Sequence, residues 1–310
     1  MKSVNRFSSI VNFAICVLLV AAPAWAQSPD TILVNGKILT VDAQSSVREA
    51  LAIRGGRIVA LGSSAEMGKL AGPQSRVIDL GGRTVIPGLI DSHLHAIRAA
   101  LSFTTEVNWI GVRTLEEALG RVKDAARTMK PGSWLIVAGG WNQQQFKENR
   151  RPTQAELVAV APKNPVYIQL GYAWAMLTPL AHRTLGITRE ADLPGGGRFE
   201  RDASGTLTGA ITGPQPAIVG LFDKLPRPTF DEQVQGTKAF FRELNRLGIT
   251  GVIDPSGNNM TGESYQALLQ VWRDEALTVR VAYSLGTQGS GNEFDELKAT
   301  TALLPMRLAD

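Results

Sequence analysis

Apolar positions follow two different spacings along this chain. In the N-terminal part, short apolar runs alternate with turn residues, as in residues 31–34 before Asn35-Gly36. Such runs, separated by turn pairs, are typical of β-hairpins. We expect residues 27–84 to form a small β-sandwich domain.

From residue 85 onward the pattern alternates between strands and helices. The runs that predict buried strands are residues 85–91, 134–138, 165–170, 249–254 and 277–283. Strands separated by helices are typical of a parallel sheet, and in the barrel form the functional residues lie at the C-terminal strand ends. We expect an α/β fold for residues 85–310. It would be a TIM-type barrel that is incomplete, because about five strands are found where a closed barrel has eight.

Helix starts and stops support this organisation. Thr114 and Glu117 have the spacing of a capping box before an apolar helical stripe, and Thr153 opens a second, shorter helix in the same way. A longer amphipathic helix is predicted over 230–247. The glycine-rich stretch near residues 193–212 lacks the elements of a phosphate-binding loop, so we interpret it as a polar hairpin inserted between barrel units.

The first residues have the pattern of an export signal. Lys2 and Arg6 precede an apolar run at residues 15–22, and Ala26 fits a cleavage site. The run is too short to span a membrane. We therefore expect residues 1–26 to be a signal peptide. The mature protein would then be exported, with the periplasm as its expected location and no stable membrane anchor.

Composition narrows the function classes. The chain is 44% hydrophobic and 19% charged, which is typical of a folded protein with a sizeable core. Loss of the signal would remove two of the 32 basic residues and leave 30 against 28 acidic ones, so nothing indicates a nucleic-acid partner. Cys16 is the only cysteine and would leave with the signal, so the mature protein would contain no disulfide.

Two of the three histidines stand at the end of the first predicted barrel strand, in the sequence His93-Leu94-His95. Side chains alternate along a strand, so both imidazoles would point to the same side. Imidazole nitrogen is a common ligand of zinc and similar metals. We interpret the pair as ligands of a divalent metal, with zinc expected; the alternative is two unrelated histidines. His182, on a predicted helix, is left out of the site.

Several motifs carry a family resemblance. Residues 85–95 read Val-Ile-Pro-Gly-Leu-Ile-Asp-Ser-His-Leu-His, and a Gly-Trp segment ending at Trp141, an Arg-Pro-Thr turn at 151–153 and a Pro-Val-Tyr strand at 165–167 follow. These motifs resemble those of the amidohydrolase superfamily and, within it, those of the family 3 branch of N-substituted formamide deformylase-like proteins. The likeness covers nearly all of the chain after residue 30.

The resemblance implies a metal-dependent hydrolase that cleaves carbon–nitrogen bonds of small amide-type substrates with a metal-activated water. His93 and His95 would hold the metal, and Asp91 would fix the tautomers of these histidines. A late-strand aspartate acts as general base in this superfamily, and we expect it beyond Asp310. The small β-domain would be completed by strands from the far C-terminus.

Three residues at predicted strand ends are candidate substrate contacts, namely Trp141, Tyr172 and Asp254. Tyr172 stands near the position where many members of the branch have an Asp-Gly-His segment, and it could instead be an aromatic residue lining the barrel mouth. Asp254 could instead cap the turn that follows its strand.

A second function class remains open at this point. No histidine follows His182, so the further histidine ligands of the superfamily are absent from this sequence. The chain could be a truncated, inactive remnant of an amidohydrolase, or an exported binding module that uses the half-pocket around Trp141 and Tyr172.

Overall fold

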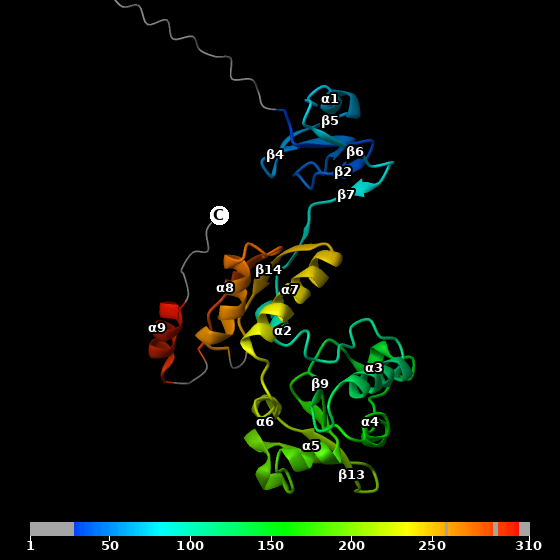
Figure 1. Ribbon diagram of the computed structural model, residues 1–310, viewed down its shortest axis with the longest axis vertical. Helices are drawn as coiled ribbons and strands as arrows, with labels where there is room; N and C mark the ends of the chain where they lie inside the picture. The colour runs from blue at the N-terminus through cyan, green and yellow to red at the C-terminus, as the bar shows by residue number, and fades with distance from the viewer. Residues whose placement is uncertain (1–27, 258–259, 288–290, 304–310) are drawn as a thin grey trace, which may run out of the picture. The chain divides into compact units, whose positions relative to one another are not determined.

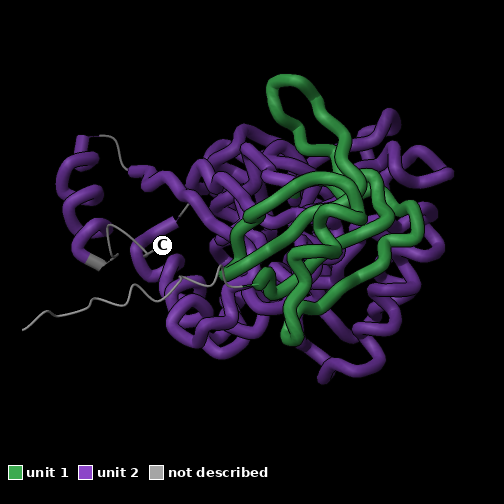
Figure 2. The backbone as a smooth tube through the Cα atoms, turned by 90° about the horizontal axis from the view of Figure 1, so that it is seen from above, with its two compact units in different colours: residues 1–87 green, residues 88–310 purple. Residues whose placement is uncertain are grey.

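The computed structural model describes residues 28–257, 260–287 and 291–303. The predicted signal peptide, residues 1–26, lies outside the described residues. The chain divides into two compact units, residues 1–87 and 88–310, which are distinguished in Figure 2. The break between the units follows Pro87, and the sequence analysis placed the domain limit after residue 84.

Unit 1 is rich in β-structure. Its elements are β1 (Thr31–Val34), β2 (Lys37–Leu39), β3 (Val47–Arg48), β4 (Ala50–Arg54), β5 (Arg57–Gly62), α1 (Ser64–Gly68), β6 (Arg76–Asp79) and β7 (Thr84–Val85). The strands form a four-stranded sheet of order β5-β4-β1-β6 and a three-stranded sheet of order β3-β2-β7. Two small apolar cores hold the unit together. One, around Ile32, joins the four-stranded sheet to α1, and the other, around Ile38 and Leu51, lies between the two sheets.

In unit 2, the first predicted barrel strand belongs to a parallel sheet. This sheet has the order β15-β14-β8, with β8 at Leu89–Asp91, β14 at Ile249–Asp254 and β15 at Arg280–Tyr283. Three helices pack on it: α2 (Ala96–Leu101), α7 (Phe230–Arg246) and α8 (Gln266–Arg273). Figure 1 shows α7 and α8 beside β14. Their apolar side chains form one core with Val252 of β14.

The same sheet leaves large apolar side chains uncovered. Ile90 is 70% exposed and Ile253 is 43% exposed, whereas Val252, their neighbour in the sheet, is buried. Successive residues of a strand point to opposite faces, so the helices cover the face of Val252 and not that of Ile253. Within the described residues the three strands form an open sheet and not a closed barrel.

A second sheet in unit 2 is mixed and has helices on both faces. Its order is β12-β13-β11-β10-β9, with β9 at Leu135–Val137, β10 at Val166–Leu170, β11 at Trp174–Leu177, β12 at Arg198–Arg201 and β13 at Leu207–Thr212. One core combines this sheet with α3 (Leu115–Thr128) and α4 (Gln154–Val160). Another combines it with α5 (Pro179–Thr184) and α6 (Gln215–Phe222).

The expectation that five strands share one barrel sheet is therefore wrong for the described residues. All five strands exist, but β9 and β10 belong to the mixed sheet. Strand β8 pairs with β14, although 158 residues separate the end of β8 at Asp91 from the start of β14 at Ile249. An apolar run shows that a segment is buried but does not identify the neighbouring strand. The short turn after β10 leads directly into antiparallel β11, which the sequence analysis did not predict.

The predicted helix starts are correct. The Thr114 side chain accepts a hydrogen bond from the Glu117 N–H at the start of α3, and Thr153 and Glu156 form a complete capping box at the start of α4. Thr229 caps α7 in the same way. These local signals are readable because each cap satisfies backbone groups within the same turn.

The remaining elements are short. They are the 3₁₀ turns Gln143–Gln145, Glu190–Asp192, Pro194–Gly196 and Gly262–Tyr265, and the helix α9 (Glu293–Leu303). No helix in the described part of the chain is both long and apolar enough to cross a membrane.

Helices α2 and α7 approach each other most closely at Gly236. A Cβ atom at this position would lie 2.4 Å from the backbone oxygen of Ala100, which is far inside van der Waals contact. Gly120 in α3 offers the opposite case, since a Cβ atom there would meet no atom within 4 Å.

We therefore predict opposite effects of the same substitution at two helical glycines. Gly120→Ala should stabilise the protein by about 0.5–1 kcal/mol, because alanine is the better helix former. Gly236→Ala should destabilise it by about 1–3 kcal/mol in spite of that gain, because the backbone of α2 must move to avoid the clash. Urea unfolding of both variants measures the difference, and equal stabilisation by the two would contradict the packing described for α2 and α7.

Candidate functional site

A cavity of about 590 Å³ opens in unit 2 near the C-terminal end of β8. Its wall is made by the segment after β8, helix α2 and the residues that follow it, the end of β9, the end of α6, and part of the segment after β14. The C-terminal ends of parallel strands are where α/β proteins place their ligands. This cavity contains both histidines of the His-Leu-His motif, which makes it the candidate site.

His93 and His95 are brought together, although not by strand geometry. Strand β8 ends at Asp91, so both histidines lie in the connection between β8 and α2. Their ring centroids are 5.4 Å apart and the ring planes are inclined by 82°. The N–H of Leu94 donates to the carbonyl oxygen of Ile253 at 3.1 Å, which holds the connection against β14. The two imidazoles therefore face one cavity from a fixed backbone.

His95 has a hydrogen-bond partner that determines its tautomer. Its Nδ1 contacts the carbonyl oxygen of Ser256, which can only accept, so Nδ1 carries the proton and Nε2 keeps its lone pair. Ser256 presents this carbonyl from a left-handed backbone conformation, with a φ of 73°, which is uncommon for a residue other than glycine. A histidine whose second nitrogen is held by a backbone carbonyl is typical of metal ligands.

Asp91 acts on the backbone of the motif and not on its rings. Its Oδ1 accepts a hydrogen bond from the N–H of His93 at 3.0 Å. The predicted contact between Asp91 and an imidazole is not among the hydrogen bonds of the described residues. The carboxylate instead closes the turn that leads from β8 to the histidines.

The candidate role of Asp254 as a substrate contact does not fit its position. Asp254 is only 1% exposed and does not line the cavity. One carboxylate oxygen accepts the N–H of Ile97 at 2.8 Å and the other accepts the N–H of Ser256 at 2.9 Å. The alternative interpretation, a cap, is the one that the structure supports. This cap orders the backbone on both sides of the His95–Ser256 contact.

Of the two aromatic candidates, the structure brings only Tyr172 to the cavity. Tyr172 lines it and is 47% exposed. Trp141 is buried, its Nε1 donates to the carbonyl oxygen of Gln169 at 2.9 Å, and its ring packs on Trp109 with centroids 5.1 Å apart. Trp141 is therefore a core residue beneath the cavity wall and not a contact surface.

Sequence reasoning missed a line of polar residues in the cavity wall. Arg98, Ser102 and Glu106 all line the cavity. They are spaced four residues apart, which places them on one side of α2 and of the turn that continues it. Burial raises the pKa of the Glu106 carboxyl, against the opposing effects of the Arg98 charge and of a hydrogen bond from Ser102. The sequence signal that could have found them is the spacing of four residues between polar positions in an otherwise apolar stretch.

The two imidazole nitrogens are donor atoms of a type that divalent metals bind. Two imidazoles, one with its Nε2 lone pair set free by Ser256, are ligands that zinc accepts. Among residues 28–257, 260–287 and 291–303, however, no group of three histidine, cysteine or carboxylate side chains is close enough to hold an ion. On this count, His93 and His95 by themselves would make up only part of a coordination shell.

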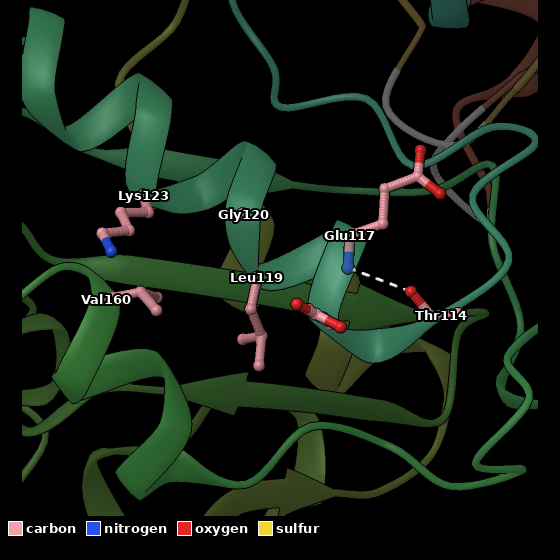
Figure 3. Close-up of a pocket in the computed structure, with 7 residues that line it drawn as sticks. Thr114, Glu117, Leu119, Gly120, Lys123 and Val160 are labelled. Carbon is pink, nitrogen blue, oxygen red and sulfur yellow. Dashed lines mark hydrogen bonds between the residues drawn. The ribbon is translucent and has the colours of Figure 1, made fainter.

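A second hollow lies between α3 and the end of α4 and has a different character. It is lined by Thr114, Glu116, Glu117, Leu119, Gly120, Lys123 and Val160 (Figure 3). The hydrogen bond drawn there, from the N–H of Glu117 to Thr114 Oγ1 at 3.1 Å, is the helix cap. Its polar groups are those of a helix end, so the hollow carries no candidate chemistry.

Comparison with known proteins agrees with the motif and the fold. The chain is 30% identical over 248 residues to N-substituted formamide deformylase of Arthrobacter pascens, a match that covers 77% of this chain and 45% of that protein. It is 33% identical over 226 residues to Protein LONG AFTER FAR-RED 3 of Arabidopsis thaliana, covering 73% of this chain and 38% of that protein. The chain thus spans less than half the length of these two curated relatives.

A solved structure gives the same result at the level of the fold. An uncharacterized metal-dependent hydrolase from Pyrococcus horikoshii superposes with a TM-score of 0.53 at 23% identity, covering 83% of this chain and 48% of that one. The sequence pattern of the amidohydrolase family matches residues 76–309, which is more than half of the chain and includes the His-Leu-His motif. On this match the chain belongs to the amidohydrolase family.

Proposed function

We propose that this chain is part of a metal-dependent hydrolase that cleaves carbon–nitrogen bonds in small amide-type molecules. The observation that carries the proposal is the pair His93 and His95, which face one cavity with the Nε2 of His95 left free by the Ser256 carbonyl. Family membership supports it. The names of the similar proteins, a formamide deformylase and a metal-dependent hydrolase, point to the same chemistry.

The residues of this chain would each have a distinct task. His93 and His95 hold the ion, Asp91 fixes the backbone of His93, and Ser256 keeps the proton of His95 on Nδ1. Asp254 holds Ser256 in place through its N–H. A divalent ion bound there would polarise the substrate carbonyl and lower the pKa of a bound water towards neutrality. Zinc is the ion that two imidazoles favour.

The cavity suits a small molecule. Its volume lies within the range of about 300–1,000 Å³ that is usual for ligand pockets. Tyr172, half exposed at its wall, is the proposed aromatic contact for the substrate. Neither the near-neutral net charge nor the cavity indicates a nucleic-acid partner.

A second candidate function rests on the ligand count. Catalytic zinc sites have three protein ligands as a rule, and the described residues bring two imidazoles together. If no further ligand joins them, the chain would bind a small molecule in the cavity without hydrolysing it.

We also propose that the fold is an incomplete barrel. In this fold β8, β14 and β15 are three barrel strands, and the mixed sheet is an insertion.

Export is a further part of the proposal and rests on the sequence alone. Residues 1–26 have the charged start, short apolar run and small residues of a cleavable signal. We propose the periplasm as the location of the mature protein. A precursor and a mature form that differ by this segment would be seen by mass spectrometry of the expressed protein.

The first prediction concerns metal binding. Zinc titrated calorimetrically into the chelator-treated chain should bind at least about tenfold more weakly to His93→Ala and to His95→Ala than to the unchanged protein, because each variant loses a nitrogen ligand. His182→Ala is the matched control. Its ring contacts the carbonyl oxygen of Gly209 at 3.1 Å, outside the cavity, so zinc affinity should not change.

Two results would contradict this assignment. One is a loss of zinc affinity in His182→Ala equal to that in His93→Ala. The other is an unchanged affinity when His93 and His95 are both replaced. Circular dichroism of each variant at the titration temperature establishes that the protein compared is folded.

The second prediction separates the two candidate functions. A hydrolase should release formate from an N-substituted formamide in a zinc-dependent manner, and His93→Ala should abolish this release because the ion is lost. Formate is measured with a coupled dehydrogenase assay. Tight zinc binding by the chain with no release from any amide of a broad panel would favour the binding module.

A further inference from the structure

Arg98 is a cation in the cavity wall whose orientation is fixed from two sides. Its guanidinium carbon lies 4.4 Å from the centroid of the Phe222 ring, and its Nη1 donates to Ser102 Oγ at 3.2 Å. The cation–π contact and the hydrogen bond together restrain the position of the guanidinium group. Among the described residues one of its five N–H groups is engaged by a protein oxygen, and Arg98 lines the cavity.

Ser102 separates Arg98 from the nearest carboxyl group. The Ser102 hydroxyl donates to Glu106 Oε1, and because it has one hydrogen it must accept from Arg98. The other Glu106 oxygen accepts the N–H of Ala138 at 3.3 Å. Arg98 and Glu106 are thus joined through a hydroxyl and do not form a direct ion pair.

The charge of Arg98 therefore has no carboxylate partner within ion-pair distance among the described residues. The other arginine of the cavity, Arg227, differs in this respect, since it lies 4.0 Å from Asp223 and its side chain is 80% exposed. A partly buried cation that lacks a partner is costly. An anion in the cavity would balance this charge.

We propose that Arg98 anchors a carboxylate group of the ligand, so that the cavity takes small amides that also carry a carboxylate. The planar guanidinium group matches a carboxylate through two parallel hydrogen bonds, and its contacts with Phe222 and Ser102 restrain its position before the ligand arrives. The inference rests on the proposed function only in that it takes this cavity as the ligand site. It requires neither a bound metal nor hydrolysis.

The test compares two probes of nearly equal size that differ in charge, N-formylglycine and N-formylglycinamide. Their binding to the full chain, stripped of metal, is measured by calorimetry. The carboxylate should bind at least about tenfold more tightly, the difference expected for one charge-assisted hydrogen bond. Arg98→Gln should remove this preference and leave the affinity for the amide within about twofold.

Two further variants make the test specific. Arg227→Gln is the matched control, because it removes the other cavity arginine and should keep the preference. Glu106→Gln should increase the affinity for the carboxylate probe, because a competing negative charge one hydroxyl away from Arg98 is lost. Circular dichroism confirms that each variant is folded.

Equal affinity of the unchanged chain for the two probes overturns the proposal, and this comparison needs no variant. An equal loss of preference in Arg98→Gln and Arg227→Gln also overturns it. Failure of the proposed function would look different. The chain would then prefer the carboxylate probe but show no zinc affinity that depends on His93 and His95.

Discussion

The candidate site depends on one buried carboxylate. Asp254, at the end of β14, accepts the N–H of Ile97 in the first turn of α2 with one oxygen and the N–H of Ser256 with the other. Buried amide groups of this kind must be paired, and a charged acceptor pairs them strongly. The interaction therefore connects two segments that are far apart in sequence. Between them lies the contact of His95 with the Ser256 carbonyl. The geometry of the imidazole pair is thus set by backbone hydrogen bonds and not by the histidine side chains themselves.

The sequence predicted the elements of this fold better than their arrangement. Helix starts at Thr114, Thr153 and Thr229 depend on hydrogen bonds within one turn, so the local sequence contains the whole signal. Strand partners depend on contacts across the chain. Leu135–Val137 and Val166–Leu170 have the apolar composition of barrel strands, but a buried strand in a mixed sheet has the same composition, and only the tertiary structure distinguishes the two cases.

The sequence likewise predicted only part of the candidate site. The His-Leu-His motif is visible because histidine is rare in this chain, and the structure places both rings at one cavity. Asp254 had two plausible roles, and the choice between them needed its buried position. Arg98, Ser102 and Glu106 were missed because an arginine among alanines looks like a surface residue of a short helix. Their connection becomes visible only when Phe222, from α6, is seen to lie against the guanidinium group.

The close approach of α2 and α7 at Gly236 has a mechanical consequence. Where backbone meets backbone there is no side chain whose rotation could absorb a displacement, so the two helices must move as one body. Helix α2 begins directly after His95 and carries Arg98 one turn further on, so both residues are held by this closely packed helix pair. Adaptation to ligands of different shape would therefore fall to parts of the wall outside this helix pair, such as Tyr172, which lies in the turn between β10 and β11.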